Sequence, residues 1–142
     1  MGTYSTKQKD IKRDWHLVDA KGEILGRLST KIAKLLMGKQ KPYFSRNLDC
    51  GDYVVVINSA KIAVTGKKEK QKLYIKHSGY PGGLKVTPLE KMRVEHPERI
   101  IIHAVSGMLP QNKLKDKMLR RLYVFAQEEH PFKDKFKVKN EK

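Results

Sequence analysis

The chain has 142 residues and a formal net charge of +16, because 31 lysines and arginines outnumber 15 aspartates and glutamates. This length suits a single domain that buries a core without disulfide or metal support. The one cysteine, Cys50, excludes an internal disulfide and a zinc site built from cysteines alone. No apolar segment has the length of a signal-peptide core or a bilayer span, so the sequence predicts a soluble, cytoplasmic protein with no membrane partner.

The positive charge is concentrated in four segments of the chain. Residues 31–46, 61–76, 113–121 and 133–142 carry net charges of +5, +5, +4 and +3, and the remainder is close to neutral. Like charges gathered in a folded protein repel one another, a cost that a bound anion offsets. Four such segments predict a polyanionic partner, and nucleic acid is the partner that fits best.

The first half of the chain predicts a βαβ unit. Trp15–Asp19 alternates apolar and polar residues as a strand does, and Gly22 marks a turn. Leu25–Met37 repeats apolar residues at helical spacing and ends before Gly38, a typical C-terminal stop. Residues 52–58 contain an unbroken run of Val and Ile, which is typical of a strand covered on both faces. We therefore expect two parallel strands joined by a crossover helix.

The second half predicts a further strand at 73–76 and several helices. Thr87 is expected to cap a helix that has Pro88 at its first position and Glu90 at its third, and Pro97 should break this helix. The next expected element is a second helix with apolar residues at Ile101, Ala104, Val105 and Met108, closed by Gly107 with Pro110. A short basic helix at 114–119, a strand at 122–125 and an extended C-terminal tail are expected to follow.

No catalytic or cofactor-binding motif is complete in this sequence. A P-loop needs an upstream glycine and a Ser or Thr after its lysine, and the segment around Gly66 has neither. The spacing of Gly22 and Gly26 differs from that of a dinucleotide-binding loop, and Ser106 lacks the preceding glycine of a nucleophile elbow. The histidines are scattered, and two aspartates near Cys50 disfavour a reactive thiolate. We expect no enzymatic activity, no cofactor, no metal site and no small-molecule substrate.

Seven short motifs occur in a fixed order along most of the chain. They are Lys12-Arg-Asp-Trp15, Val18-Asp-Ala20, Leu25-Gly-Arg-Leu28, Gly51-Asp-Tyr-Val54, Ala60-Lys-Ile-Ala-Val-Thr-Gly66, His77-Ser-Gly-Tyr-Pro-Gly-Gly83 and Val105-Ser-Gly-Met-Leu-Pro110. Together they resemble bacterial large-subunit ribosomal protein thirteen, of the universal "L thirteen" family. The resemblance covers about residues 10–131. After Pro131 the sequence departs from the family's His- and Gln-rich end, so no family contact carries over to the tail.

The resemblance implies a fold as well as a function. The implied fold is α/β, with three layers (α/β/α) around a four-stranded, largely parallel sheet. The residues themselves predict one domain with basic loops at 1–131, followed by a lysine-rich C-terminal tail at 132–142. The implied function is that of a structural, non-enzymatic constituent of the large ribosomal subunit. Such a protein binds ribosomal RNA, lies near other large-subunit proteins in the cytoplasmic ribosome and acts early in subunit assembly.

The basic segments supply the candidate RNA contacts, because Lys and Arg bind phosphates without reading sequence and folded RNA is recognised largely by shape. Gly82 and Gly83 allow the backbone to approach a phosphate, and the ring of Tyr80 is suited to stacking on a base. The candidates form a first patch (Arg27, Lys31, Lys34, Lys39, Lys41, Arg46), a second patch (Lys67, Lys68, Lys70, Lys72, Lys76, His77, Tyr80, Gly82, Gly83) and a third patch (Lys113, Lys115, Lys117, Arg120, Arg121).

Two other functions stay open at the level of sequence. A free regulator that binds messenger or other RNA outside the ribosome would use the same patches. An α/β enzyme acting on a phosphorylated substrate would use the turn at 22–26 and nearby basic residues. A membrane-surface role is disfavoured, because the basic helix has no aromatic anchors on its apolar face.

Overall fold

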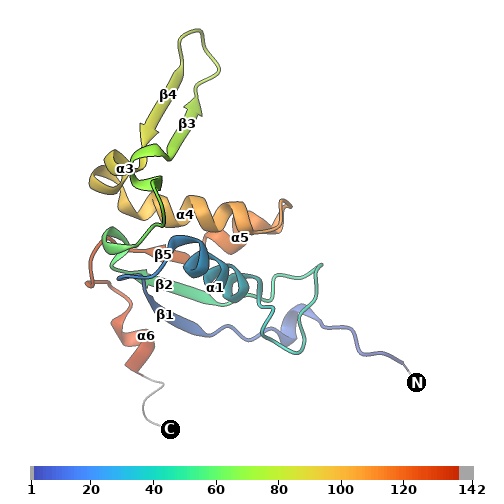
Figure 1. Cartoon of the computed structure of the whole chain (residues 1–142). Helices are drawn as coiled ribbons and strands as arrows, with labels where there is room; N and C mark the ends of the chain where they lie inside the picture. Colours follow the sequence, from blue (N-terminus) through green and yellow to red (C-terminus); the bar gives the residue numbers. More distant parts are fainter. Residues whose placement is uncertain (1, 138–142) are drawn as a thin grey trace.

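The computed structural model describes residues 2–137, which contain a parallel sheet and a separate hairpin (Figure 1). The parallel sheet has the strand order β1-β2-β5, with β1 at Trp15–Asp19, β2 at Tyr53–Ile57 and β5 at Leu122–Val124. Helix α1 (Leu25–Met37) connects β1 to β2, as parallel neighbours require. The predicted βαβ unit is therefore confirmed.

The strand predicted at 73–76 does not join this sheet. Instead, β3 (Leu73–His77) pairs with β4 (Leu84–Pro88) in an antiparallel hairpin that projects from the body of the protein (Figure 1). The expectation of a four-stranded sheet is wrong, because the described residues form a three-stranded parallel sheet and a two-stranded hairpin. A tight turn, in which the Gly83 amide donates to the Tyr80 carbonyl at 3.0 Å, favours this local pairing. The mostly exposed side chains of β3 also lack the apolar run of a buried strand.

One face of the parallel sheet carries the hydrophobic core. Leu28 and Ile32 of α1 meet Ile101 and Val105 of α4 (Pro97–Met108) there, and all four side chains are buried. Spacings of three or four residues place them on one side of each helix. Helix α1 ends where the sequence predicts, since the next residue has the left-handed backbone of a C-terminal cap.

The opposite face of the sheet carries a layer of aromatic rings. Trp15 of β1 stacks on Tyr53 of β2, with ring centroids 4.4 Å apart. Phe132 packs 5.2 Å from the ring of Trp15 and 4.5 Å from that of Tyr123. The two faces of the sheet are therefore covered differently, one by helices α1 and α4 and the other by these rings.

A short helix, α6 (Lys133–Lys137), follows Phe132 and contacts β1. The expected extended tail is thus wrong for these residues. The physical reason is that Phe136 adds an apolar contact to the aromatic layer, edge-on to Trp15 at 6.4 Å. The rest of the predicted tail, 138–142, lies outside the described residues.

The expected capping box at Thr87 is also wrong. Thr87 lies in β4 opposite Tyr74, and helix α3 (Leu89–Glu95) begins after Pro88 without a side-chain cap. The hairpin ladder holds Thr87 in extended backbone, and this pairing prevails over the local capping preference. The other helical segments are η1 (Gln8–Asp10), η2 (Ser59–Lys61), α2 (Lys68–Gln71) and the predicted α5 (Leu114–Leu119). Within residues 2–137, no helix is long and apolar enough to cross a membrane.

Candidate nucleic-acid interface

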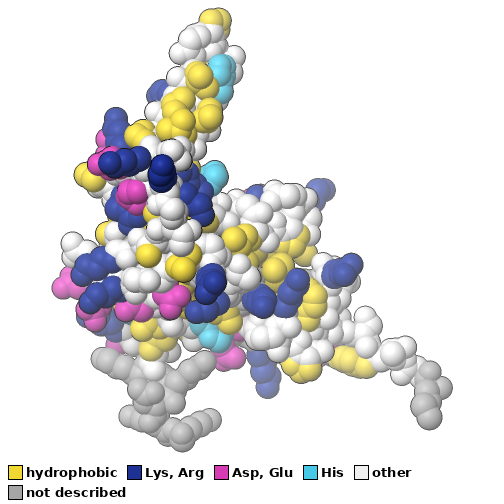
Figure 2. Space-filling view, viewed as in Figure 1, with side chains coloured by type: hydrophobic (Ala, Val, Ile, Leu, Met, Phe, Trp, Pro, Cys, Tyr) yellow, Lys and Arg dark blue, Asp and Glu magenta, His cyan; other side chains and the backbone are white. Residues whose placement is uncertain are grey.

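Helix α1 presents a basic face to solvent, away from its core face. Arg27, Lys31 and Lys34 are exposed there, as their helical spacing predicts. Lys31 makes an ion pair with Glu23 at 3.5 Å, but both side chains stay largely exposed, so the pair competes weakly with a larger anion. Figure 2 shows lysine and arginine side chains spread over the body and the base of the hairpin.

The loop after α1 leads from this basic face to a hollow of about 340 Å³. Lys39 and Arg46 of the first patch line it together with Pro110 and Asn112, which lie just before the third patch. Met37, Phe44, Leu48 and Met118 are among its apolar lining residues. The fold therefore brings the end of the first patch beside the start of the third, although the two are far apart in sequence.

The third patch lies on and around α5. Lys113, Lys117 and Arg120 are exposed, whereas Lys115 is half-buried and its ammonium donates to the Gln111 side chain at 2.7 Å. In the Gly-Met-Leu-Pro motif that precedes it, Leu109 is buried as a packing residue. The exposed members of this patch are free to meet a phosphate backbone.

Lys41 points inward, unlike its neighbours in the first patch. Its ammonium donates to the carboxylate of Asp52 and to the carbonyls of Cys50 (3.0 Å) and Lys12. The side chain of Lys41 is 10% exposed and that of Asp52 is 2% exposed. The ammonium is thus used within the fold.

Asp52 is the centre of this buried group of polar contacts. Its carboxylate accepts hydrogen bonds from the backbone amide of Asp14 and the side chain of Gln40, both at 3.0 Å, and lies 2.8 Å from Nε2 of His16. Burial by itself would raise the pKa of Asp52, but Lys41, the Asp14 amide and His16 together hold it below its usual value. Asp52 therefore ties the loop after α1 to the start of the sheet.

Arg121 is also directed into the protein rather than toward solvent. Its guanidinium donates through both terminal nitrogens to the Asp49 carboxylate, and it also reaches the carbonyls of Leu36 (3.2 Å) and Asp52 (3.3 Å). The residue is 7% exposed. The sequence predicts Arg121 as an RNA contact of the third patch, together with its neighbour Arg120, which is exposed. A basic run in the sequence cannot show which of its members faces inward.

The second patch surrounds the hairpin. Lys67, Lys68, Lys70 and Lys76 are exposed, while Lys72 is half-buried and lies 5.7 Å from the ring of Tyr74. At the tip, Tyr80 is 76% exposed. The remaining predicted residues of the tip are His77 and Gly82, which are exposed, and Gly83, which is half-buried.

Two glycines at the tip are required by its backbone. Gly82 has a φ of 71°, in the left-handed region, and an ideal Cβ on Gly83 would lie 2.9 Å from the carbonyl oxygen of Tyr80 and 1.9 Å from the Ser78 hydroxyl. The tip is thus a defined tight turn that exposes a tyrosine.

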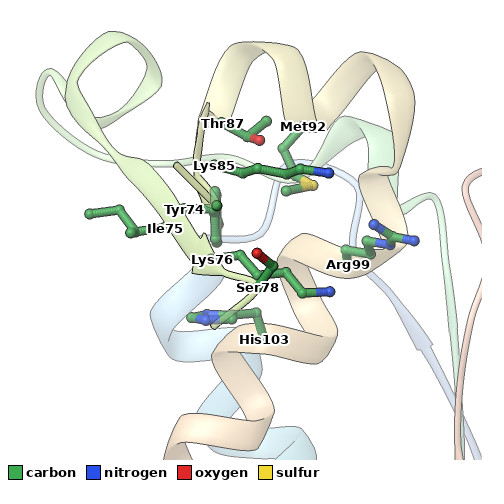
Figure 3. A pocket seen from close by; sticks show the side chains of 10 residues that line it. Tyr74, Ile75, Lys76, Ser78, Lys85, Thr87, Met92, Arg99 and His103 are labelled. Atoms are coloured by element: carbon green, nitrogen blue, oxygen red, sulfur yellow. The ribbon is translucent and has the colours of Figure 1, made fainter. Parts of the chain in front are cut away.

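A second hollow, of about 640 Å³, lies between the hairpin and α4 (Figure 3). Three of its lining residues are cations from three different elements: Lys76 of β3, Lys85 of β4 and Arg99 of α4. His103 of α4 lies edge-on to Tyr74, with centroids 5.2 Å apart. Sequence reasoning missed Lys85, Arg99 and His103, because each stands outside the dense basic runs. A signal for Lys85 comes from the alternation of side chains along the two strands. Once the hairpin pairs Lys76 with Lys85, both side chains lie on the same face.

The turn at 22–26 is poorly suited to hold a phosphate. The amides of Gly22 and Leu25 donate to the carbonyls of Lys61 (3.1 Å) and Ala63 (2.9 Å), and that of Glu23 donates to Ala20. These amides are therefore not available to an anion, which argues against the enzyme hypothesis.

Comparison with known proteins agrees with these observations. The sequence pattern of the family described as Ribosomal protein L13 matches residues 13–131. Three relatives each bear the name "Large ribosomal subunit protein uL13". Those of Dehalococcoides mccartyi (strain 195) and Alcanivorax borkumensis are each 53% identical to this chain, and that of Dictyoglomus thermophilum is 50% identical. Each alignment covers 131 residues, or 92% of either chain. The chain therefore belongs to the ribosomal protein L13 family, whose members are structural ribosomal proteins and not enzymes.

Proposed function

We propose that this protein is a constituent of the large ribosomal subunit that binds ribosomal RNA through separate basic surfaces and acts early in subunit assembly. The observation that carries this proposal is the exposure of basic side chains on distinct elements around one core. The proposed RNA-binding residues are all members of the three patches except Lys41 and Arg121: Arg27, Lys31, Lys34, Lys39, Arg46, Lys67, Lys68, Lys70, Lys72, Lys76, His77, Tyr80, Gly82, Gly83, Lys113, Lys115, Lys117 and Arg120.

Lys41 and Arg121 are left out of this surface. Both were predicted as RNA contacts, but each has a carboxylate partner and backbone carbonyl acceptors inside the fold. Withdrawing either from its carboxylate would leave a buried charge without its partner. Their role is to fix the loop that carries Lys39 and Arg46 beside α5.

The mechanism is electrostatic attachment with a defined shape. Lysines and arginines that contact phosphates release counterions, which gives affinity without sequence reading. Patches on a rigid core bind only an RNA whose phosphates have the matching arrangement, which gives specificity for a fold. A protein that holds two RNA segments in this way stabilises their arrangement before later components arrive, which supports early action.

The proposed partners include neighbouring large-subunit proteins as well as RNA. Hydrophobic side chains gather on the projecting hairpin in Figure 2. Ile75 and Val86, which face each other across the hairpin, are 67% and 47% exposed. An exposed apolar surface of this kind supports a protein contact, which the folded chain alone does not supply.

The proposal is tested by sedimentation of cell lysate on sucrose gradients at low and moderate salt. The protein should sediment with the large subunit, and after pulse labelling it should enter the earliest precursor particles. Material that stays at the top of the gradient at both salt concentrations would contradict the ribosomal role and favour the free RNA regulator.

A variant set tests the basic face of α1. The triple change Arg27→Gln, Lys31→Gln and Lys34→Gln should lower incorporation into large subunits without lowering the melting temperature, since all three side chains are exposed. The control, with the same change of net charge, is Lys9→Gln, Lys21→Gln and Lys91→Gln, at exposed residues outside the three patches. Equal incorporation of the two variants would remove this face from the proposed interface.

A further inference from the structure

Within residues 2–137, the hollow between the hairpin and α4 is lined by cationic residues and by no acidic one. Figure 3 shows the side chains of Lys76 and Lys85 extending toward the side where Arg99 lies, while Ile75 points the other way. The hollow is also lined by Tyr74, Ser78, Thr87 and His103. Its volume of about 640 Å³ falls within the range of about 300–1,000 Å³ typical of ligand pockets.

Two of the three cations stand directly opposite each other. Lys76 and Lys85 are Cα partners across the antiparallel hairpin, a placement in which like charges destabilise the strand pair. Arg99 adds a third positive charge from α4. In the part of the chain that the structure describes, none of these three side chains forms an ion pair. An anion in the hollow would offset this repulsion and join the hairpin to α4.

The other polar groups of the hollow suit a sugar–phosphate chain. The hydroxyls of Ser78 and Thr87 line it and can donate to phosphate oxygens or exchange hydrogen bonds with a ribose. Tyr74 and His103, in edge-to-face contact, close one part of the lining. A ligand here therefore meets cations and hydroxyl groups beside an aromatic pair.

The chemical class of the anion follows from the number of cations and from the separate elements that carry them. Three cations from three elements need several negative charges in succession, which every RNA backbone provides, whereas a peptide needs a run of acidic residues. The hollow is also continuous with the second patch through Lys76. Unpaired RNA segments are commonly held by aromatic side chains and arginine, and both kinds of residue line this hollow.

We propose that the hollow between the hairpin and α4 binds the sugar–phosphate backbone of a non-helical segment of ribosomal RNA, with phosphates at Lys76, Lys85 and Arg99. This inference rests on the proposed RNA-binding function and deepens it. Binding would clamp the projecting hairpin against the body, so the hairpin would take a fixed direction in the subunit.

The first test locates RNA from inside the hollow. The Ser78→Cys variant is labelled with a tethered iron chelate that generates hydroxyl radicals, and it is then incorporated into large subunits. Cys50 stays unlabelled because it is buried. Background cleavage is measured with the same chelate on Val94→Cys, an exposed position of α3 outside the hollow. Cleavage at the general RNA interface is measured with the chelate on Lys34→Cys of α1. Strong cleavage at one short RNA segment from residue 78 is expected.

The outcomes separate the hollow from the broader proposal. Cleavage from residue 34 but none from residue 78 would overturn the hollow as an RNA site and leave the ribosomal function standing. Attachment of a protein neighbour to a photo-crosslinker at residue 78, without RNA cleavage, would assign the hollow to an acidic protein segment and also overturn the proposal.

The second test measures charge in the hollow. Lys76→Gln, Lys85→Gln and Arg99→Gln together should reduce the slope of log binding constant against log salt by about two to three, for three lost phosphate contacts. The measurement is competition with wild type for incorporation into reconstituted large subunits over a series of salt concentrations. The control is the Lys9, Lys21 and Lys91 triple variant, which removes the same charge elsewhere.

The melting temperature distinguishes loss of binding from loss of folding. Because the hollow holds repelling charges, its triple variant should melt at the same temperature as wild type or higher. Equal salt slopes for the hollow variant and the control would overturn the proposal. If the triple variant melted at a lower temperature than wild type, the single variant Arg99→Lys, which keeps the positive charge, would be compared with wild type instead. It should enter large subunits as wild type does, and its failure to do so would count against a phosphate site.

Discussion

The guanidinium of Arg121 binds the carboxylate of Asp49 through both terminal nitrogens, although the two residues are 72 positions apart in the chain. The pair joins the loop before β2 to the residue before β5, and Arg121 also reaches the last turn of α1 through the Leu36 carbonyl. A bidentate pair of this kind fixes orientation as well as distance. Arg121 therefore organises the ends of three elements beside the proposed RNA surface.

Two adjacent arginines should separate stability from RNA binding. Arg121→Ala should lower the free energy of unfolding by about 3–5 kcal/mol, because it leaves Asp49 without its partner in a mostly buried place. Arg120→Ala should leave the melting temperature within error, since Arg120 is exposed, and should lower incorporation into large subunits. Chemical denaturation and subunit incorporation measure the two effects. Equal stability of the two variants would contradict the internal role of Arg121.

The Asp52 carboxylate should make stability depend on pH. Its pKa in the folded protein is lowered, against the effect of burial, by Lys41, the Asp14 amide and His16. A carboxyl group with a lower pKa in the folded state stabilises the fold above its unfolded pKa of about 4, and this contribution is lost as pH falls through the folded value. The free energy of unfolding should therefore decline from about pH 5 downward.

Asp52→Asn identifies the share of this pH dependence that belongs to Asp52. At pH 7 the variant should be less stable by about 3 kcal/mol or more, because Lys41 loses its buried partner. The difference from wild type should shrink as the pH falls from about 4, the unfolded pKa, through the lower pKa of the folded state, below which wild-type Asp52 is neutral as well. A difference that stays constant with pH would show that the carboxylate charge has no part in it. Urea denaturation over this pH range is the measurement.

Gly51 should tolerate no side chain. An ideal Cβ there would lie 1.6 Å from the Leu36 carbonyl oxygen and 2.8 Å from Nη2 of Arg121. Gly51→Ala should cost about 3 kcal/mol or more, at the upper end of the cost of overpacking, because backbone must move. The matched control is Gly26→Ala in α1, which meets no atom within 4 Å and should stabilise the helix by about 0.5–1 kcal/mol. Thermal unfolding of both variants tests the contrast.

Phe132 should protect the only tryptophan of the chain. Its ring packs on Trp15 and Tyr123, so Phe132→Ala should shift the Trp15 fluorescence to longer wavelength and lower stability by about 1–2 kcal/mol. Tyr80→Ala, at the exposed hairpin tip, should change neither quantity. An unchanged spectrum in the Phe132 variant would mean that the aromatic layer does not cover Trp15 in solution.

Local patterns in the sequence were sufficient to predict much of the fold. The period of apolar residues in Leu25–Met37, the glycine after it and the apolar run at 52–58 together predicted the βαβ unit, because helix and strand periodicities depend on neighbours in the chain. The order of the motifs was sufficient to identify the family. Charge counting found exposed members of all three patches, since lysine and arginine away from apolar positions usually face water.

Only the tertiary structure decided which partners distant residues meet. The 73–76 strand pairs with β4 rather than the parallel sheet, and Phe132 packs on Trp15 just before helix α6, which contacts β1. Pairing and aromatic packing of this kind depend on segments that no local pattern connects. For the same reason Lys41 and Arg121, which look like their exposed neighbours, lie beside buried carboxylates. Lys76, Lys85 and Arg99 converge on one hollow through strand register and helix docking. The sequence by itself determined the amount of charge and its distribution along the chain, and the fold determined which charges are available to an RNA.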